Sequence, residues 1–282
     1  IYKMKSLLFL YLCVAMAFSA MASSVSDTYV IPNPQQMVCG DGHFVLRAQA
    51  SFSCNLTGAD KDDFVSYVSN SPLLLTYKKK GKADITFKLV SPENAKMKEE
   101  AYRLKVTKKG IQAEATSASG LFYAFQSIVQ LARESGNDTY QLPEVTIEDA
   151  PRFSYRGMHL DVSRHFYTKE FVKKQIDALA RYKLNCFHWH LTDGAGWRIE
   201  IKKYPELTRE TAYRPFPDWK SWWNGGRTYC RQDAPGASGG YYTQEDVKEI
   251  VEYARQRHIT VIPEIEMPAH SEEVLAALPQ LA

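Results

Sequence analysis

The chain has 282 residues, with 35 Lys and Arg against 32 Asp and Glu, so its formal net charge is only +3. A balance this close excludes a strongly basic or acidic surface as the dominant feature, and it gives no reason to expect nucleic acid or an anionic membrane as a partner. Hydrophobic residues make up 45% of the chain, which is enough to build the core of one or two globular domains.

The first segment is typical of an export signal. Lysines precede an apolar run from residue 7 to residue 18, and Ala20-Met21-Ala22 follows as a small-residue cleavage site. We therefore predict a signal peptide over residues 4–22 and a periplasmic or extracellular mature protein. The apolar run is shorter than the ~20 residues of a spanning helix, so no membrane span is expected. A lipoprotein anchor at Cys13 is the alternative.

Export would permit disulfide bonds in the remaining chain. Four cysteines follow the predicted signal, namely Cys39, Cys54, Cys186 and Cys230. Cys39 and Cys54 flank a short strand-like segment and could pair, whereas Cys186 is expected inside a buried strand. Their spacing matches no zinc-binding pattern, so neither a disulfide framework nor a cysteine-bound metal is implied.

Residues 27–150 have the pattern of a small α+β domain. Alternating apolar side chains predict strands near residues 85, 102 and 111, and the last two are separated by a tight-turn sequence. Apolar residues at helical spacing then predict a helix over residues 117–133. Nothing in this segment indicates catalysis.

The pattern of the sequence changes after residue 150. Apolar runs and helical periodicities alternate, which predicts strands at 155–162, 185–191 and 259–265 and helices at 168–182 and 243–257. Parallel strands need such helical crossovers. We therefore predict that residues 151–282 begin a (β/α)8 TIM barrel, within an α/β fold, and include about three of its eight strand–helix units. An open doubly wound sheet is the alternative, but no glycine-rich phosphate loop follows the first strand.

Polar residues gather where each predicted strand ends. Asp161 and Arg164 follow the first strand, Asp193 the second, and Glu264, Glu266 and His270 the third. Polar clusters at the C-terminal ends of strands are typical of the active face of a barrel.

The second strand carries a His188-Trp189-His190 sequence. Because strand side chains alternate, the two histidines share one face and Trp189 takes the other. With His270 and the nearby acids, this spacing also suits the ligands of a metal-dependent hydrolase, which is a competing interpretation.

Three motifs, in this order, resemble those of family 20 glycoside hydrolases, the β-N-acetylhexosaminidases, and the preceding α+β segment is similar to their non-catalytic domain. The motifs are Arg156-Gly157-Met158-His159-Leu160-Asp161-Val162-Ser163-Arg164-His165, His188-Trp189-His190-Leu191-Thr192-Asp193 with Trp197-Arg198, and Pro263-Glu264-Ile265-Glu266-Met267-Pro268-Ala269-His270. The resemblance implies hydrolysis, with retention, of terminal N-acetylglucosamine or N-acetylgalactosamine from oligosaccharides or glycoconjugates. The sugar's own 2-acetamido oxygen attacks the anomeric carbon in this chemistry, and no cofactor is needed.

The resemblance also implies roles for individual residues. Arg156 matches an arginine that grips sugar hydroxyls. Asp193 and His270 match a pair that supports the catalytic acid. Glu266 lies on the acetamide side of the pocket, and Asp161 is placed at the substrate pocket, ion-paired with Arg164.

The long connection before residue 240 contains Trp219, Trp222 and Trp223. These side chains could form an aromatic platform for further sugars, or they could simply pin the connection onto the barrel.

The family carries its catalytic Asp-Glu pair on the fourth strand, and no Asp-Glu dipeptide follows His270. We therefore expect this chain to be a fragment of a longer enzyme and inactive alone. The alternative from another functional class is a carbohydrate-binding remnant without catalysis.

Overall fold

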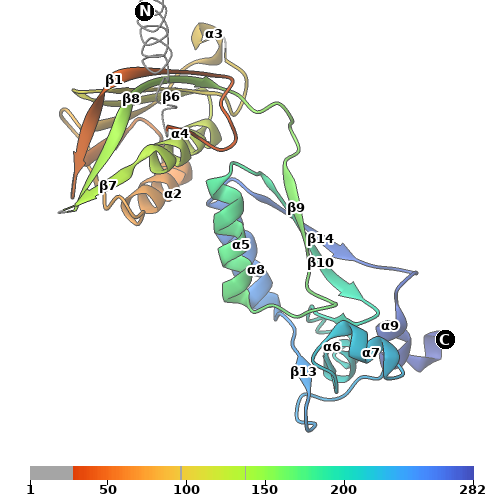
Figure 1. The fold of residues 1–282 in the computed structure, drawn as a ribbon. Helices are drawn as coiled ribbons and strands as arrows, with labels where there is room; N and C mark the ends of the chain where they lie inside the picture. The colour runs from red at the N-terminus through yellow and green to blue at the C-terminus, as the bar shows by residue number, and fades with distance from the viewer. Residues whose placement is uncertain (1–27, 96, 137) are drawn as a thin grey trace, which may run out of the picture.

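A computed structural model of the chain describes residues 28–95, 97–136 and 138–282. It has an N-terminal lobe built on one large sheet and a C-terminal lobe built on a smaller, mostly parallel sheet (Figure 1). The signal peptide predicted over residues 4–22, and Cys13 with it, lies outside the described residues. Within the described ranges, no helix combines the length and the apolar character needed to cross a bilayer.

The sheet of the N-terminal lobe has the strand order β1-β8-β5-β6-β4-β2-β3, and β7 pairs with β8 at its margin. Strands β5 and β6 form the predicted antiparallel hairpin. The alternating apolar residues of these strands are buried on one face, as predicted. The strands are β1 (Gln36–Arg47), β2 (Ser51–Cys54), β3 (Thr76–Tyr77), β4 (Ile85–Leu89), β5 (Tyr102–Thr107), β6 (Gly110–Ala115), β7 (Arg133–Gly136) and β8 (Thr139–Asp149).

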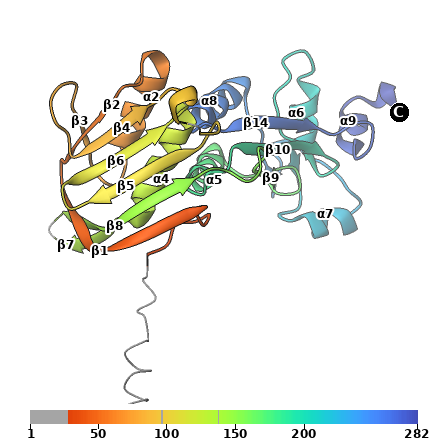
Figure 2. The same ribbon diagram turned by 90° about the horizontal axis from the view of Figure 1, so that it is seen from above.

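Helices α2 (Gly58–Ser69) and α4 (Ala118–Leu131) cover that face of the sheet (Figures 1 and 2). Ser117 begins α4 by accepting a hydrogen bond from the backbone N–H of Gly120 at 3.1 Å, which satisfies one free donor of the first turn. The predicted helix over 117–133 is thus confirmed to within two residues. A single turn, α3 (Pro92–Ala95), lies between β4 and β5.

The C-terminal lobe is organised around β10 (Cys186–Asp193). Strands β9 (Gly157–Asp161) and β14 (Thr260–Ile265) pair with β10 on its two sides, and both pairings are parallel. The three predicted strands are confirmed, and their helical crossovers make this an α/β arrangement. Closure into a (β/α)8 barrel stays a prediction.

Helices α5 (Lys169–Arg181) and α8 (Gln244–Arg255) pack on one face of this parallel sheet (Figure 1). Trp189 points to this side and is fully buried, with its ring 4.7 Å from that of Tyr242. Thr243 caps α8 through a reciprocal capping box with Asp246. The other face of the sheet therefore carries His188 and His190.

Short elements fill the connection between β10 and α8. They are β11 (Gly196–Trp197), α6 (Glu206–Thr211), β12 (Tyr213–Arg214), α7 (Trp219–Asn224) and β13 (Ser238–Gly239), and α9 (Glu272–Ala277) with the 3-10 turn η1 (Pro279–Leu281) follows β14. The Arg198 side chain, 1% exposed, donates hydrogen bonds to the carbonyl oxygens of Ser163, Ala212 and Gly240. One buried guanidinium thus holds three loops together.

The four cysteines outside the predicted signal are all free thiols. Cys39 lies in β1 and Cys54 in β2, and four strands separate β1 from β2 in the sheet. With strands about 4.8 Å apart, that separation is far beyond the reach of a disulfide bond. The possible Cys39–Cys54 pairing is therefore wrong for this structure.

Candidate functional site

The C-terminal ends of β9, β10 and β14 meet at one edge of the parallel sheet. Asp161 and Asp193 are the last residues of β9 and β10, and Glu264 is the last but one of β14. In the strand register, His190 lies between Asp161 and Glu264. The backbone pairing therefore brings the predicted polar residues together without help from any loop.

The carboxylate of Asp193 is the centre of this edge, and the residue is only 4% exposed. Its Oδ2 lies 2.7 Å from Nη2 of Arg164, 3.1 Å from Nε2 of His190 and 3.3 Å from Nδ1 of His270. Its Oδ1 accepts the backbone N–H of Gly194 at 2.8 Å. Asp193 and His270 thus lie in contact, and their role as the pair that supports a catalytic acid stays a prediction.

Arg164 reaches Asp193 because of a local turn after β9. Asp161 Oδ1 accepts the backbone N–H groups of Ser163 and Arg164 at 2.9 and 3.0 Å, and Asp161 Oδ2 accepts from Nη1 of Arg164 at 2.9 Å. The Arg164 side chain is 35% exposed, so its guanidinium bridges two carboxylates and still faces solvent. The cation of this edge is therefore Arg164, paired with Asp161 as predicted.

Arg156 is not at this edge. It immediately precedes β9, at the opposite end of the strand, and its guanidinium binds both carboxylate oxygens of Glu100 at 3.0 Å. It also donates to the carbonyl oxygens of Phe153 and Lys183, each at 2.8 Å. The expectation that Arg156 grips sugar hydroxyls does not fit this position, because its donors are already used to join the two lobes.

Glu266 and His270 follow β14. The backbone N–H of Glu266 donates to Oγ1 of Thr192 at 2.9 Å, which ties the segment after β14 to the end of β10. The Glu266 side chain is half-buried. His270 has a positive φ of 50° and a side chain that is 61% exposed.

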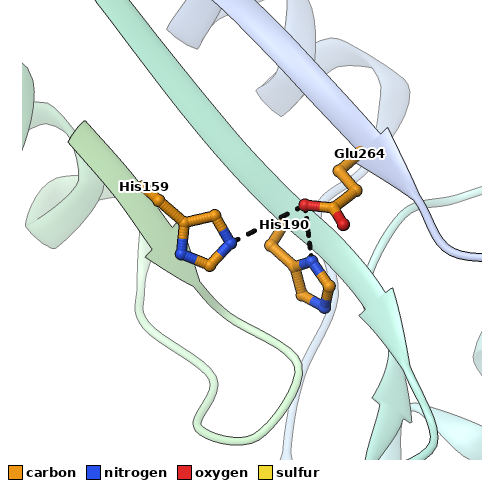
Figure 3. Close-up of side chains that lie close together, drawn as sticks. All are labelled: His159, His190 and Glu264. Atoms are coloured by element: carbon orange, nitrogen blue, oxygen red, sulfur yellow. Dashed lines mark ion pairs between the residues drawn. The ribbon is translucent and has the colours of Figure 1, made fainter. Parts of the chain in front are cut away.

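Glu264 meets three histidines on the face of the sheet opposite the helices. Its Oε2 lies 2.7 Å from Nδ1 of His190, 2.6 Å from Nε2 of His188 and 3.6 Å from Nε2 of His159 (Figure 3 shows the pairs with His159 and His190). Burial raises the pKa of Glu264, but hydrogen bonding and charge from His190 and His188 outweigh burial and leave the pKa below its usual range. His159, His190 and Glu264 each offer one donor atom within 4.8 Å of the others, the spacing of a metal site.

The three tryptophans of α7 divide into two kinds. Trp222 is 1% exposed and pins the helix, whereas Trp219 and Trp223 are 41% and 45% exposed with ring centroids 5.3 Å apart. Arg227 covers part of Trp223, with its guanidinium carbon 3.7 Å from the ring centroid. Trp222 therefore fits the interpretation that the tryptophans pin the connection, and a sugar platform formed by Trp219 and Trp223 stays a prediction.

Contacts hold α7 next to the Asp193 edge. The hydroxyl of Tyr229 donates to the carbonyl oxygen of Gly194, and Nη1 of Arg227 lies 3.3 Å from Oε1 of Glu272. These contacts tie the segment after α7 to Gly194, the residue that follows Asp193, and to α9.

Sequence reasoning missed the carboxyl group of Glu273. It is 0% exposed, and neither oxygen has a hydrogen-bond partner among the described residues. Burial, reinforced by the negative charges of Asp193 and Glu272, raises the pKa of Glu273 to about 8. Nothing in the sequence distinguishes it from an ordinary acid in the first turn of a helix.

Two models of glycosyl hydrolase family 20 match the chain, the catalytic domain over residues 153–282 and domain 2 over residues 27–150. The chain is 39% identical over 265 residues to a β-hexosaminidase of Vibrio furnissii, covering 92% of this chain and 41% of that protein. It is 47% identical over 192 residues to a β-hexosaminidase of Porphyromonas gingivalis, covering 66% and 23%.

Solved structures give the same result. An exo β-N-acetylglucosaminidase of Vibrio harveyi, in complex with N-acetylglucosamine, superimposes with a TM-score of 0.76 at 34% identity and covers 92% of this chain and 40% of that one. A β-N-acetylhexosaminidase of Bacteroides fragilis gives 0.74 at 34% identity, covering 90% and 48%. The chain thus spans less than half the length of these relatives.

Proposed function

Because the chain belongs to glycosyl hydrolase family 20, we propose that it forms part of an exo-acting β-N-acetylhexosaminidase that removes terminal N-acetylglucosamine or N-acetylgalactosamine with retention of configuration. The observation that carries the proposal is the Asp193 carboxylate, held by Arg164, His190 and His270 where parallel strands end. N-acetylhexosamine-containing oligosaccharides or glycoconjugates are the substrates. The bound N-acetylglucosamine of the Vibrio harveyi relative supports this class.

The proposed hydrolysis gives each of the site residues a role. The substrate's acetamido oxygen attacks the anomeric carbon, so the protein supplies an acid for the leaving oxygen rather than a nucleophile. Asp193 and His270 orient that acid and tune its proton affinity. Arg164, with its planar set of donors, is the group placed to bind sugar hydroxyls, with Asp161 holding it in position. Glu266 faces the acetamide side.

The chain alone is proposed to bind sugar without turning it over. No Asp-Glu dipeptide occurs after His270, and the chain spans 41% of the Vibrio furnissii relative. We propose that β9, β10 and β14 are the first strands of a (β/α)8 barrel and that the protein is exported. Trp219 and Trp223 are proposed as a platform for sugars beyond the terminal one, supported by their exposure.

The test uses the polypeptide of the whole reading frame that contains this chain. It should hydrolyse 4-nitrophenyl N-acetyl-β-glucosaminide, release the β-anomer first in a ¹H NMR time course, and leave 4-nitrophenyl β-glucoside, which lacks the acetamido group, intact. Comparable cleavage of the glucoside would overturn the substrate-assisted mechanism. Activity abolished by EDTA and restored by a metal would favour the metal-dependent hydrolase instead.

The 282-residue chain is the matched control. It should show no turnover, yet give saturation-transfer NMR signals from N-acetylglucosamine that disappear in Arg164→Met. Turnover by this chain would contradict its proposed inactivity.

A further inference from the structure

We propose that His159, His190 and Glu264 form a binding site for one divalent transition-metal ion of the zinc type on the face of the parallel sheet opposite α5 and α8. The proposed hydrolysis needs no metal, so this inference does not rest on the proposed function. The three residues come from three adjacent strands, one each from β9, β10 and β14.

The strand register brings the donor residues together, so the position of the cluster follows from the backbone pairing. His188 is paired with His159 in β9, and His190 is paired with Glu264 in β14. Paired residues of neighbouring strands point to the same face, with strands about 4.8 Å apart. The His159 and His188 rings accordingly lie with centroids 4.7 Å apart.

The donor atoms are spaced as a small cation requires. Zinc bonds of about 2.0–2.1 Å in a tetrahedral site hold neighbouring donors about 3.3 Å apart. The Glu264 Oε2 atom lies 2.6, 2.7 and 3.6 Å from the nearest nitrogens of His188, His190 and His159. One donor atom each of His159, His190 and Glu264 lies within 4.8 Å of the other two, so side-chain movements of about 1–1.5 Å would bring them to this spacing, and imidazole and carboxylate are both donors that zinc binds.

One ring nitrogen of His190, Nδ1, has no hydrogen bond, and a bound cation would give it a partner. Nε2 of His190 lies 3.1 Å from Oδ2 of Asp193, and Nδ1 lies 2.7 Å from Oε2 of Glu264. A neutral imidazole carries one N–H, so only one of the two carboxylates can receive it. Nδ1 is in fact buried without a hydrogen bond of acceptable geometry. A metal ion at Nδ1 would separate it from the Glu264 oxygen and leave the N–H on Nε2 for Asp193.

The Asp193 contact is the outer-shell partner that such a site needs. Metal-binding histidines usually donate their second ring N–H to a carboxylate, which fixes the tautomer and the ring orientation. Asp193 stands in that position. In this chain the side chains of His159 and Glu264 are 49% and 27% exposed, whereas that of His190 is 6% exposed.

The experiment titrates the EDTA-stripped 282-residue chain with Zn²⁺ by calorimetry and with Co²⁺ by visible absorption. One ion per chain and a tetrahedral Co²⁺ spectrum are expected. His159→Ala and Glu264→Gln should each weaken Zn²⁺ binding at least about tenfold, since each removes one bond to the metal. Both side chains are partly exposed, so these variants should keep the far-UV circular dichroism of the parent.

His43→Ala is the matched control, since His43 is an exposed histidine of β1 in the other lobe. It should leave Zn²⁺ affinity unchanged. Absence of saturable Zn²⁺ binding by the folded chain would overturn the proposal, and so would binding that survives both His159→Ala and Glu264→Gln.

Discussion

Nη2 of Arg164 lies 2.7 Å from Oδ2 of Asp193, whose side chain is 6% exposed. The same oxygen also contacts His190 and His270, so one carboxylate oxygen contacts a guanidinium and two imidazoles. A carboxylate in this position organises the edge of the sheet before any substrate arrives. Loss of the Asp193 carboxylate should therefore lower the stability of the fold as well as the affinity for sugar.

Asp193→Ala should lower the free energy of unfolding by about 2 kcal/mol, because Arg164 and His190 each lose one of their two carboxylate partners in a mostly buried place. Urea denaturation of the 282-residue chain measures this. Asp233→Ala, at an exposed position of the same lobe, is the control and should change the value by under about 0.5 kcal/mol. A cost below about 1 kcal/mol for Asp193→Ala would show that solvent screens the cluster.

Arg156→Met should destabilise the junction of the two lobes by about 2–3 kcal/mol, since it removes a two-pronged ion pair with Glu100 and two hydrogen bonds to backbone carbonyls. Arg156→Lys should restore only part of the lost stability, because an ammonium group cannot form the same pair of hydrogen bonds to the Glu100 carboxylate. Urea denaturation measures both variants, with the exposed Arg152→Met as control. Affinity for N-acetylglucosamine should not change, and a selective loss of sugar affinity without loss of stability would restore the sequence-based role.

The sequence predicts the secondary structure of the C-terminal lobe well because its signals are local. Thr168 and Thr243 cap α5 and α8, and alternation places His188 and His190 on one face. Parallel pairing then follows from the helical crossovers, and it brings strand ends together, which is why the gathering of polar residues such as Asp161, Asp193 and Glu264 at one edge could be predicted.

Arg156 and Glu273 show where sequence reasoning stops. Arg156 stands one residue before β9, at the end of the strand remote from the site, and its partner Glu100 is 56 residues earlier in the chain. A motif match does not show at which end of a strand a residue lies. It also does not reveal a partner so distant in the sequence. Glu273 is next to another glutamate, and only the packing of α9 determines which of the two is buried.

Trp219→Ala should weaken binding of an N-acetylglucosamine trisaccharide about fivefold, or about 1 kcal/mol, and leave the monosaccharide unaffected, if the exposed face of α7 stacks on outer sugars. Titration calorimetry with both sugars measures the difference. Tyr204→Ala, which removes another exposed aromatic side chain of the lobe, is the control. Equal affinities for the trisaccharide with a lower melting temperature would mean that Trp219 only pins the loop.

Glu273 should make stability fall as pH rises. Its pKa is raised from the ordinary 4.5 to about 8 in the folded chain, so the folded state holds a proton that the unfolded state has released. The associated stabilisation is complete below about pH 4.5 and is lost as pH rises through about 8, with a slope of up to about 1.4 kcal/mol per pH unit between these values.

Glu273→Gln should flatten this slope and stabilise the chain above neutral pH, because a neutral amide carries no charge to bury. The measurement is urea unfolding at a series of pH values from 5 to 9, read as the difference between variant and parent so that other titrating groups cancel. Asp233→Asn is the control, since Asp233 is an exposed acid of the same lobe. A parallel pH dependence in Glu273→Gln and the parent would show that water or a further chain segment solvates the Glu273 carboxylate.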